Sequence, residues 1–459
     1  MATEARATGS PRTDRGARVA LLTPYSGTNL GDAAIQESVI RHLRRRLPDV
    51  RISGITLDAA LTSRRHGIPC VPIAGVPVEF YFSRPASAAP APDVPGAAMT
   101  GARRSPGTAR ARLKSLPLLG PSLRVAARFA RRVWAVRLEV PHLARSWTYA
   151  RGQDLILASG GGQIDDEWGG PWGHPYALFK WACLARLAGA RFALASVGVG
   201  RLDRRLSRWF VRRALGLAAY RSYRDAGSKA MLGDVALTRG DPCVPDLALG
   251  LVAPGAGSGG GVAARIGVSP IAFGDPDRWP TEKRQVFERY LAELTAFVRW
   301  LAGRGDEVVL FASSGSDRSI ASGIVREVAS AADAGGQVAR VRRADDATLD
   351  ALLSELAALD LVVASRLHGV ILAHLLGKPV LAVSFDRKVE AHMDDFGQRS
   401  YCLHIASVSR AELHSGFERL RSDATLVRER IRSAAATARR AVDAQFDQLA
   451  DLATGSHRP

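Results

Sequence analysis

The 459-residue sequence predicts an α/β protein built from two Rossmann-like domains with parallel sheets that face each other across a cleft. Short apolar runs recur along the chain, and each leads through a loop rich in Gly, Asn or Asp into a segment with helical spacing. This order is typical of parallel sheets. A Gly-rich stretch at 251–262 separates two such series and predicts a hinge. Hydrophobic residues make up 47% of the chain and charged residues 23%, which excludes a mostly disordered protein.

The first series predicts an N-terminal domain over residues 17–250, after a polar stretch at 1–16 that we expect to be disordered. Its apolar runs predict buried strands, because each is short and ends in a loop with turn-forming residues. Strands are expected at 17–26, 50–57, 154–159 and 191–200, and helices at 33–47, 177–189 and 208–218.

The second series predicts a C-terminal domain over residues 263–408, followed by a mostly helical segment at 409–459. Two Rossmann-like halves joined by a hinge, with a long C-terminal helix, indicate a GT-B-like architecture. A fold of this kind does not by itself give a function. Strands are expected at 265–271, 307–313, 359–365 and 379–385, and helices at 282–303, 347–359 and 366–377.

A Pro-, Ala- and Arg-rich insertion at 83–145 interrupts the first domain. The formal net charge is +19, and the stretch 101–151 carries twelve Lys or Arg against one acidic residue, or +11 of that charge. We expect most of residues 83–122 to be flexible and a basic amphipathic helix to follow at 122–140. The segment 101–145 suggests peripheral contact with the anionic inner face of a membrane; the alternative is a solvated helix that packs on the protein. No nucleic-acid partner is expected, because the aromatic residues here have helical spacing and form no base-stacking row.

The four cysteines are far apart and form no CxxC pair, which is typical of thiols in a reducing compartment. No apolar stretch reaches the roughly 18 residues that cross a bilayer. The N-terminal residues lack the apolar core of a signal peptide. We therefore expect a cytoplasmic protein, peripheral at the membrane if the basic segment binds lipid. We expect no metal and no cofactor.

Ligands of open α/β sheets bind beyond the carboxyl ends of the strands, so polar and glycine residues there are candidates for a site. Asn29 and Asp32 follow the first predicted strand, although Asp32 could instead cap the next helix. Gly160, Gly161 and Gly162 follow another strand, and consecutive glycines expose backbone N–H groups that can hold an anion.

Cationic residues occupy three further loops of this kind. Arg224 stands before a predicted helix, where it could hold a carboxylate or phosphate or form an ion pair with the aspartate that follows it. Arg366 and His368 lie between a fully apolar strand and an apolar helix, where the helix N-terminus favours anions. Lys388 follows the next strand. The residues alone thus predict a cleft enzyme for a phosphorylated or carboxylated small molecule. The chain has no Walker A, HExxH or GxSxG element.

Read in order, the segments NLGD, GGGQ, SVGVG, RSYRD, VPDLAL and SRLHG, followed by GKPVLAVSFDRK, resemble the polysaccharide pyruvyl transferase family. The resemblance covers about residues 17–250 and 261–400, and SRLHG with the run after it is its most specific part. It implies a GT-B-like fold and transfer of the enolpyruvyl group of phosphoenolpyruvate onto a sugar, as a ketal across two hydroxyls. The basic insertion and the QIDDEWGG segment depart from the family pattern and leave the acceptor sugar open.

The resemblance also implies roles for individual residues. Arg224, Arg366, Leu367 and His368 match the family's phosphoenolpyruvate site. We expect the two arginines to hold the carboxylate and phosphate, because two adjacent anionic groups need at least two cationic donors. His368 would stabilise the phosphate or act as general acid, and Asp32 is a candidate base for the attacking hydroxyl. The partners are then phosphoenolpyruvate and a polysaccharide sugar or its lipid- or nucleotide-linked precursor. The alternative is a GT-B-type glycosyltransferase that uses a nucleotide sugar.

Overall fold

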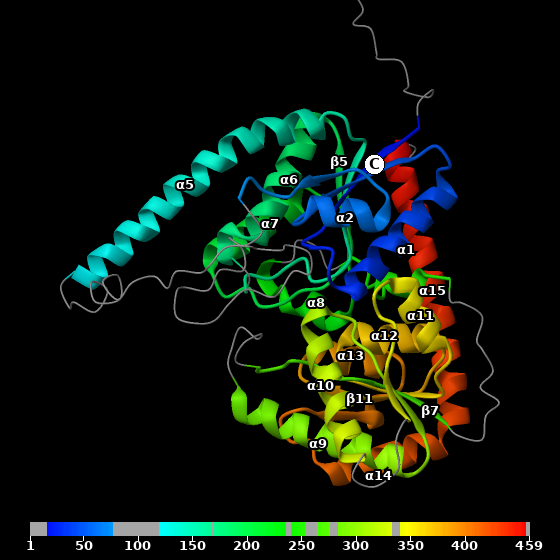
Figure 1. Cartoon of the computed structure of the whole chain (residues 1–459). Coiled ribbons are helices and arrows are strands. Elements are labelled where there is room, and N and C mark those ends of the chain that lie inside the picture. The colour runs from blue at the N-terminus through cyan, green and yellow to red at the C-terminus, as the bar shows by residue number, and fades with distance from the viewer. Residues whose placement is uncertain are drawn as a thin grey trace, which may run out of the picture.

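Two parallel sheets of six strands form the two halves of the protein (Figure 1). The order is β3-β2-β1-β4-β5-β6 in the first sheet and β12-β11-β10-β7-β8-β9 in the second. Each sheet is thus doubly wound, with its switch point between β1 and β4 or between β7 and β10. The predicted α/β class is confirmed. The computed structural model describes residues 16–76, 119–167, 169–235, 240–252, 264–275, 283–332 and 340–455.

The central strands are apolar on both faces, because helices cover both sides of each parallel sheet. In the first half the strands are β1 (Arg18–Leu22), β2 (Arg51–Thr56), β3 (Cys70–Pro72), β4 (Leu155–Ser159), β5 (Arg191–Val197) and β6 (Tyr220–Tyr223). In the second half they are β7 (Arg265–Ser269), β8 (Glu307–Leu310), β9 (Val341–Arg343), β10 (Leu361–Ala364), β11 (Val380–Ser384) and β12 (Cys402–His404).

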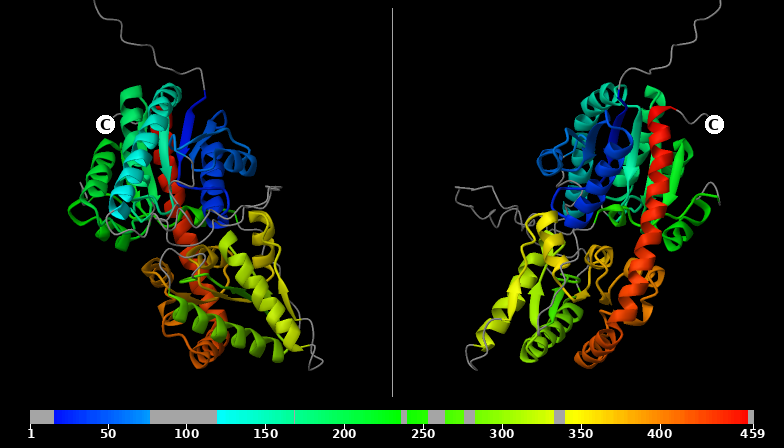
Figure 2. Two further views of the ribbon diagram at one scale, coloured as in Figure 1. Left: turned by 60° about the vertical axis from the view of Figure 1, so that its left-hand side comes forward. Right: turned by 90° about the vertical axis from the view of Figure 1, so that its right-hand side faces the viewer.

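Helices follow most of these strands and form the outer layers of the two halves (Figure 2). In the first half they are α1 (Leu30–Arg46), α2 (Ala59–His66), α5 (Leu119–Ala150), α6 (His174–Ala188), α7 (Arg205–Leu217) and α8 (Ala226–Met231), with the short helices η1 (Gly170–Trp172), η2 (Gly233–Val235) and η3 (Leu247–Gly250). In the second half they are α9 (Arg284–Gly303), α10 (Gly315–Ala332), α11 (Leu349–Ala357), α12 (Leu367–Leu375), α13 (Arg387–Asp395), η4 (Arg399–Tyr401), α14 (Arg410–Ser422) and α15 (Ala424–Thr454).

The C-terminal segment, which the sequence predicted to be mostly helical with a long helix, consists of two helices, α14 and α15. Helix α15 runs back from the second half along the first (Figure 2). Arg46 of α1 forms an ion pair with Asp447 of α15 at 2.7 Å. Gln445 of α15 is buried, and its amide donates to Ser196 Oγ at 3.1 Å. One hydrophobic cluster includes strands of both sheets together with α1, α12 and α15, so the two halves share a core.

Helix α5 contains the basic helix predicted at 122–140, but its C-terminal part belongs to the packed first half. Glu139 accepts hydrogen bonds from the Gly75 backbone N–H at 2.8 Å and from Lys180 Nζ at 2.7 Å. The His142 ring lies within hydrogen-bond distance, 3.0 Å, of the Pro72 carbonyl. These buried polar contacts tie the C-terminal part of the helix to the first half, as in the predicted alternative of a helix that packs on the protein. The stretch 77–118 lies outside the described residues.

Among the described helices, none combines the length and the apolar composition that a bilayer span requires. The predicted hinge at 251–262 falls almost entirely outside the described residues.

Candidate functional site

The N-termini of α1 and α12 meet between the two halves. Asn29 caps α1, because its side-chain oxygen accepts a hydrogen bond from the Gly31 backbone N–H at 2.9 Å. The alternative of Asp32 as the cap is therefore wrong, and Asp32 lies in the first turn of the helix. Helix N-termini carry a partial positive charge and free N–H groups, so two of them together favour an anion.

The contact between these helices is tight. The Leu30 backbone N–H donates to the Ser313 carbonyl in the second half at 2.8 Å. A Cβ built on Gly31 would lie 2.1 Å from the imidazole of His368, so the ring is packed directly on the α1 backbone. The structure thus brings together the predicted loops at 29–32 and 366–368.

Replacing Gly31 with Ala is expected to lower the free energy of unfolding by about 1–3 kcal/mol, because the new methyl group would overlap the His368 ring. Denaturant unfolding of the purified protein measures this. Gly323→Ala is the matched control, because a Cβ at that helical position meets no atom within 4 Å. The double variant Gly31→Ala/His368→Ala should lose less than the sum of its single variants. Wild-type stability of Gly31→Ala would contradict the packing described here.

Arg224, Asp246 and His368 form a charged cluster beside this contact. Arg224 follows β6 and is 8% exposed. Oδ2 of Asp246 lies 3.6 Å from Arg224 Nη1 and 3.7 Å from His368 Nε2. Burial alone would raise the pKa of Asp246, but the polar contact with His368 and the charges of His368 and Arg224 lower it to about 2. The Asp246 carboxylate is therefore ionised at neutral pH and lies between the Arg224 guanidinium and the His368 ring.

Three atoms of this cluster point to a ligand. Arg224 Nη2, Asp246 Oδ2 and His368 Nε2 are buried and have no hydrogen-bond partner among the described residues. Leaving such an atom unpaired costs about 1–3 kcal/mol, and native proteins keep few of them. Because all three lie in one cluster next to two helix N-termini, we expect a polar ligand to satisfy the two donors.

Asp32 faces the same cluster from α1. Its Oδ2 accepts a hydrogen bond from the Asn29 amide at 3.0 Å, so Asn29 positions this carboxylate. Desolvation raises the pKa of Asp32; the charge of His368 opposes this rise and that of Asp246 adds to it. A carboxyl group with a raised pKa is suited to proton transfer, and the role of base for Asp32 stays a prediction.

The glycine loop after β4 is hydrogen-bonded to the loop after β5, on which the Arg224 side chain packs. Gly160 and Gly161 adopt positive φ angles of 58° and 70°, which glycine allows without strain. The Gly161 carbonyl accepts a hydrogen bond from the Gly198 N–H at 2.7 Å. A Cβ on Gly198 would lie 2.9 Å from Arg224 Nη2, so the guanidinium packs directly on the backbone of Gly198. Direct anion binding by this loop stays a prediction.

Arg366 is held in the second half by a partner that the sequence did not reveal. Its Nε and Nη2 both donate to the buried carboxylate of Asp317, and Nη2 also donates to Ser316 Oγ at 3.0 Å. Asp317 further accepts a hydrogen bond from the Ala272 N–H at 3.0 Å. Leu367, the first residue of α12, packs on the shared core. The guanidinium of Arg366 is thus fixed by three hydrogen bonds just after β10.

The positive charge of Lys388, in the second half, affects the pKa of Asp165, in the first half. It lies in the first turn of α13, with Nζ 3.8 Å from Asp386 Oδ2. Desolvation raises the pKa of Asp165 to about 6, against the positive charge of Lys388. Gly200 and Gly162 flank Asp165, and a Cβ on Gly200 would lie 2.7 Å from its Cβ. Asp165, from the QIDDEWGG segment, therefore joins the edge of the site.

The Asp165→Asn variant is expected to lose a pH dependence of stability. The folded-state pKa of about 6 exceeds the ordinary 3.8, so the folded protein binds this proton more tightly than the unfolded chain. Wild-type stability should therefore fall by about 1–2 kcal/mol from this group as the pH rises from about 4 to about 6. Urea unfolding across that range measures it, with exposed Glu288→Gln as the control. An unchanged pH profile in Asp165→Asn would contradict the raised pKa.

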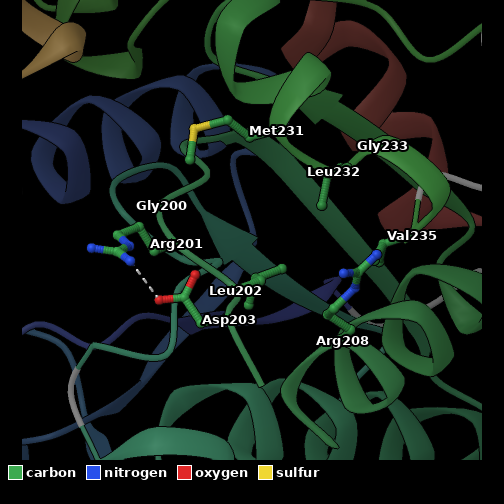
Figure 3. Close-up of a pocket in the computed structure, with 9 residues that line it drawn as sticks. All are labelled: Gly200, Arg201, Leu202, Asp203, Arg208, Met231, Leu232, Gly233 and Val235. Carbon is green, nitrogen blue, oxygen red and sulfur yellow. Dashed lines mark ion pairs between the residues drawn. The ribbon is translucent and has the colours of Figure 1, made fainter. Parts of the chain in front are cut away.

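A cavity of about 290 Å³ opens beside Gly200, between the loop after β5, helix α7 and the end of α8 (Figure 3). Arg201 and Asp203 form an ion pair at 2.9 Å on one side of it, and Arg208 lies on the other. A second cavity, of about 450 Å³, lies on α5 around Tyr149. No residue that the sequence predicted for the site lines either cavity. The site is therefore defined by the charged cluster between the helix N-termini.

Sequence reasoning named Arg224, Arg366 and His368 but missed Asp246 and Asp317. The VPDLAL segment that contains Asp246 was part of the family pattern, and this was the available signal. For Asp317 the sequence offers no motif. It lies at the start of α10, 49 residues before its partner.

Comparison with solved structures shows the fold. A UDP-N-acetylglucosamine 2-epimerase is similar with a TM-score of 0.53 at 10% sequence identity, covering 97% of this chain and 98% of that one. A putative UDP-N-acetylglucosamine 2-epimerase from Listeria monocytogenes has a TM-score of 0.53 at 10% identity, covering 91% of each chain. These similarities confirm the GT-B-like architecture. No significant match was found among curated protein sequences.

Comparison with protein families gives one match, polysaccharide pyruvyl transferase, over residues 29–387. The matched region begins at the cap of α1 and ends at the start of α13, so it contains both meeting helix N-termini and the charged cluster between them. The chain belongs to the polysaccharide pyruvyl transferase family.

Proposed function

We propose that this enzyme transfers the enolpyruvyl group of phosphoenolpyruvate onto two hydroxyls of a sugar and releases phosphate. The acceptor is a sugar of a polysaccharide or of its lipid- or nucleotide-linked precursor. The observation that carries this proposal is the cluster of Arg224 and His368, in which Arg224 Nη2 and His368 Nε2 have no hydrogen-bond partner within the described part of the chain and lie by two helix N-termini. Phosphoenolpyruvate carries a carboxylate and a phosphate close together, and this arrangement offers several cationic and N–H donors in one place.

The chemistry needs an acid and a base. The methylene carbon of phosphoenolpyruvate gains a proton, and the first sugar hydroxyl adds to the oxocarbenium-like carbon as it loses its own proton. The C–O bond to phosphate then breaks, and the second hydroxyl closes the ketal and loses its proton. Of the two hydroxyl protons, one balances the methyl group that forms and the other leaves with phosphate.

Three side chains suit these steps. His368, oriented by ionised Asp246, would donate a proton or stabilise the departing phosphate. Asp32, with its raised pKa, would accept a proton from the attacking hydroxyl. Arg366 would hold an anionic group while Asp317 fixes its guanidinium.

The test is phosphate release from phosphoenolpyruvate with a panel of lipid-linked and nucleotide-linked sugars. We expect release that depends on the acceptor and is lost in Arg366→Ala. The control is Arg421→Ala, which removes an exposed arginine of α14. Release of a nucleoside diphosphate from a nucleotide sugar, without use of phosphoenolpyruvate, would instead establish the glycosyltransferase alternative.

We also propose that the basic segment 101–145 contacts the anionic inner face of the membrane, where lipid-linked glycans would be reached. Its charge supports this. Because Glu139 and His142 pack into the first half, the variant that tests it should delete only residues 101–118. Co-sedimentation with anionic vesicles that is unchanged by the deletion would contradict this contact.

A further inference from the structure

We propose that a second surface, formed by α7 and η1, docks on the anionic surface of a lipid bilayer. This inference does not rest on the proposed reaction or on the segment 101–145. Between residues 201 and 213 the chain carries six arginines and one acidic residue, Asp203, a formal charge of +5. The same stretch exposes two large apolar side chains, Leu206 and Trp209.

The spacing along α7 arranges these side chains in two neighbouring stripes. Residues at i, i+3 and i+7 share one side of a helix. The buried side of α7, which includes Phe210 and Val211, packs on the first half. Its exposed side therefore carries two neighbouring stripes of side chains. One is mostly apolar and ends in an arginine, and the other is entirely basic. The first stripe is Leu206, Trp209 and Arg213, and the second is Arg205, Arg208 and Arg212.

Exposed tryptophans extend the apolar stripe. Trp172 of η1 is 56% exposed and Trp209 is 45% exposed. Both pack on the buried ring of Phe210, with centroid distances of 5.5 Å and 5.3 Å, so the first half fixes their positions. The guanidinium of Arg213 lies 5.6 Å from the Trp209 ring centroid. Rigid tryptophans beside arginines are typical of surfaces that sit at the headgroup level of a bilayer.

The apolar area continues toward the cavity of Figure 3. Met231, at the end of α8, is 42% exposed and lines that cavity together with Arg208 of the basic stripe. Figure 3 shows Met231 and Arg208 among the residues around the cavity. Exposed apolar side chains thus occur on η1, α7 and α8, with arginines of α7 among them.

The positive charge of this surface and its exposed apolar side chains favour a lipid bilayer over a second copy of this chain or a nucleic acid. A second copy of this chain would bring two faces of the same positive charge together, which is unfavourable. A nucleic acid would satisfy the charge, but the tryptophans are not arranged as a row onto which successive bases could stack. An anionic lipid surface satisfies both stripes, because headgroups attract the arginines and the acyl boundary receives Trp172, Leu206 and Trp209.

The test is co-sedimentation of the full chain with vesicles of phosphatidylcholine, with and without phosphatidylglycerol. We expect binding only to the anionic vesicles, weakened by salt. Arg205→Gln/Arg212→Gln should weaken it by about tenfold or more. Arg421→Gln/Arg439→Gln removes the same charge from α14 and α15, helices that lie away from α7, and should weaken binding far less (Figure 1).

A second measurement locates the face that touches lipid. Brominated lipid should quench tryptophan fluorescence of the bound protein, and Trp172→Phe/Trp209→Phe should keep binding but lose most of this quenching. Absence of binding to anionic vesicles, equal binding by the two arginine pairs, or unchanged quenching in the double Phe variant would each overturn the proposal. The proposal would also be overturned if Arg205→Gln/Arg212→Gln lost binding to a DNA duplex but still bound vesicles.

Discussion

Arg224→Gln is expected to lower kcat/KM for phosphoenolpyruvate by about 10³-fold, or about 4 kcal/mol. The guanidinium is 8% exposed and keeps one nitrogen, Nη2, without a hydrogen-bond partner among the described residues. Glutamine removes the charge from a site where little water can replace it. It also removes the guanidinium beside the ionised carboxylate of Asp246, so the pKa of Asp246 should rise in the variant.

The comparison that isolates the guanidinium is Arg224→Lys, which keeps the charge but loses the planar fork, and which should fall between wild type and Arg224→Gln. Arg212→Gln, an exposed arginine of α7, controls for the loss of one charge. Thermal unfolding of each variant separates a lost anion contact from a loss of folding. An unchanged KM for phosphoenolpyruvate in a folded Arg224→Gln protein would show that this residue does not hold the donor.

His368→Gln is expected to lower kcat by about 10²–10⁴-fold, because glutamine can donate a hydrogen bond but cannot transfer a proton. Asp246→Asn should also lower kcat, because Asp246 acts through His368. Its Oδ2 lies 3.7 Å from His368 Nε2. Since the two side chains act as one unit, the double variant should be no slower than the slower single variant. Steady-state kinetics of the four proteins form the cycle.

The ionisation of Asp246 adds a pH test. Its folded-state pKa of about 2 lies below the ordinary 3.8, so its contribution to stability is present above about pH 4 and is lost as the pH falls toward 2. Asp246→Asn should flatten this acid limb of the stability profile. Additive kinetic losses in the double variant, or wild-type turnover in His368→Gln, would exclude the paired role.

The sequence predicted much of the site because three of its loops follow strongly apolar strands. The loops at 29–32 and 160–162 follow β1 and β4, which are neighbours at the switch point of the first sheet. The loop at 366–368 follows β10, which occupies the equivalent place in the second sheet. Strand order was not needed to name these residues, since the carboxyl ends of parallel strands share one edge.

Other parts of the site depend on contacts that periodicity does not encode. Asp246 follows no strand of either sheet; it caps the short helix η3 and reaches the cluster from the segment between β6 and β7. Asp317 meets Arg366 only because α10 and α12 begin at the same edge of the second sheet. Such pairings follow from tertiary packing.

The fold, like the site, has parts that the sequence predicted and parts that it did not. The long apolar strands and amphipathic helices were predicted, whereas β3, β9 and β12 have three residues each and are too short for an alternating pattern to appear. In α5 the basic composition predicted a helix but not which of its residues would pack on the first half. Its C-terminal part packs there because Glu139 and His142 find buried partners on elements far away in sequence.

Calorimetric titration with phosphoenolpyruvate, in the absence of acceptor, tests the central claim most directly. We predict one molecule bound per chain, with binding lost in Arg224→Gln and in Arg366→Ala but retained in Arg212→Gln. A parallel titration with UDP-N-acetylglucosamine distinguishes the alternative donor. Absence of phosphoenolpyruvate binding to the wild-type protein, together with binding of the nucleotide sugar that requires Arg366, would contradict the proposed reaction and favour a glycosyltransferase.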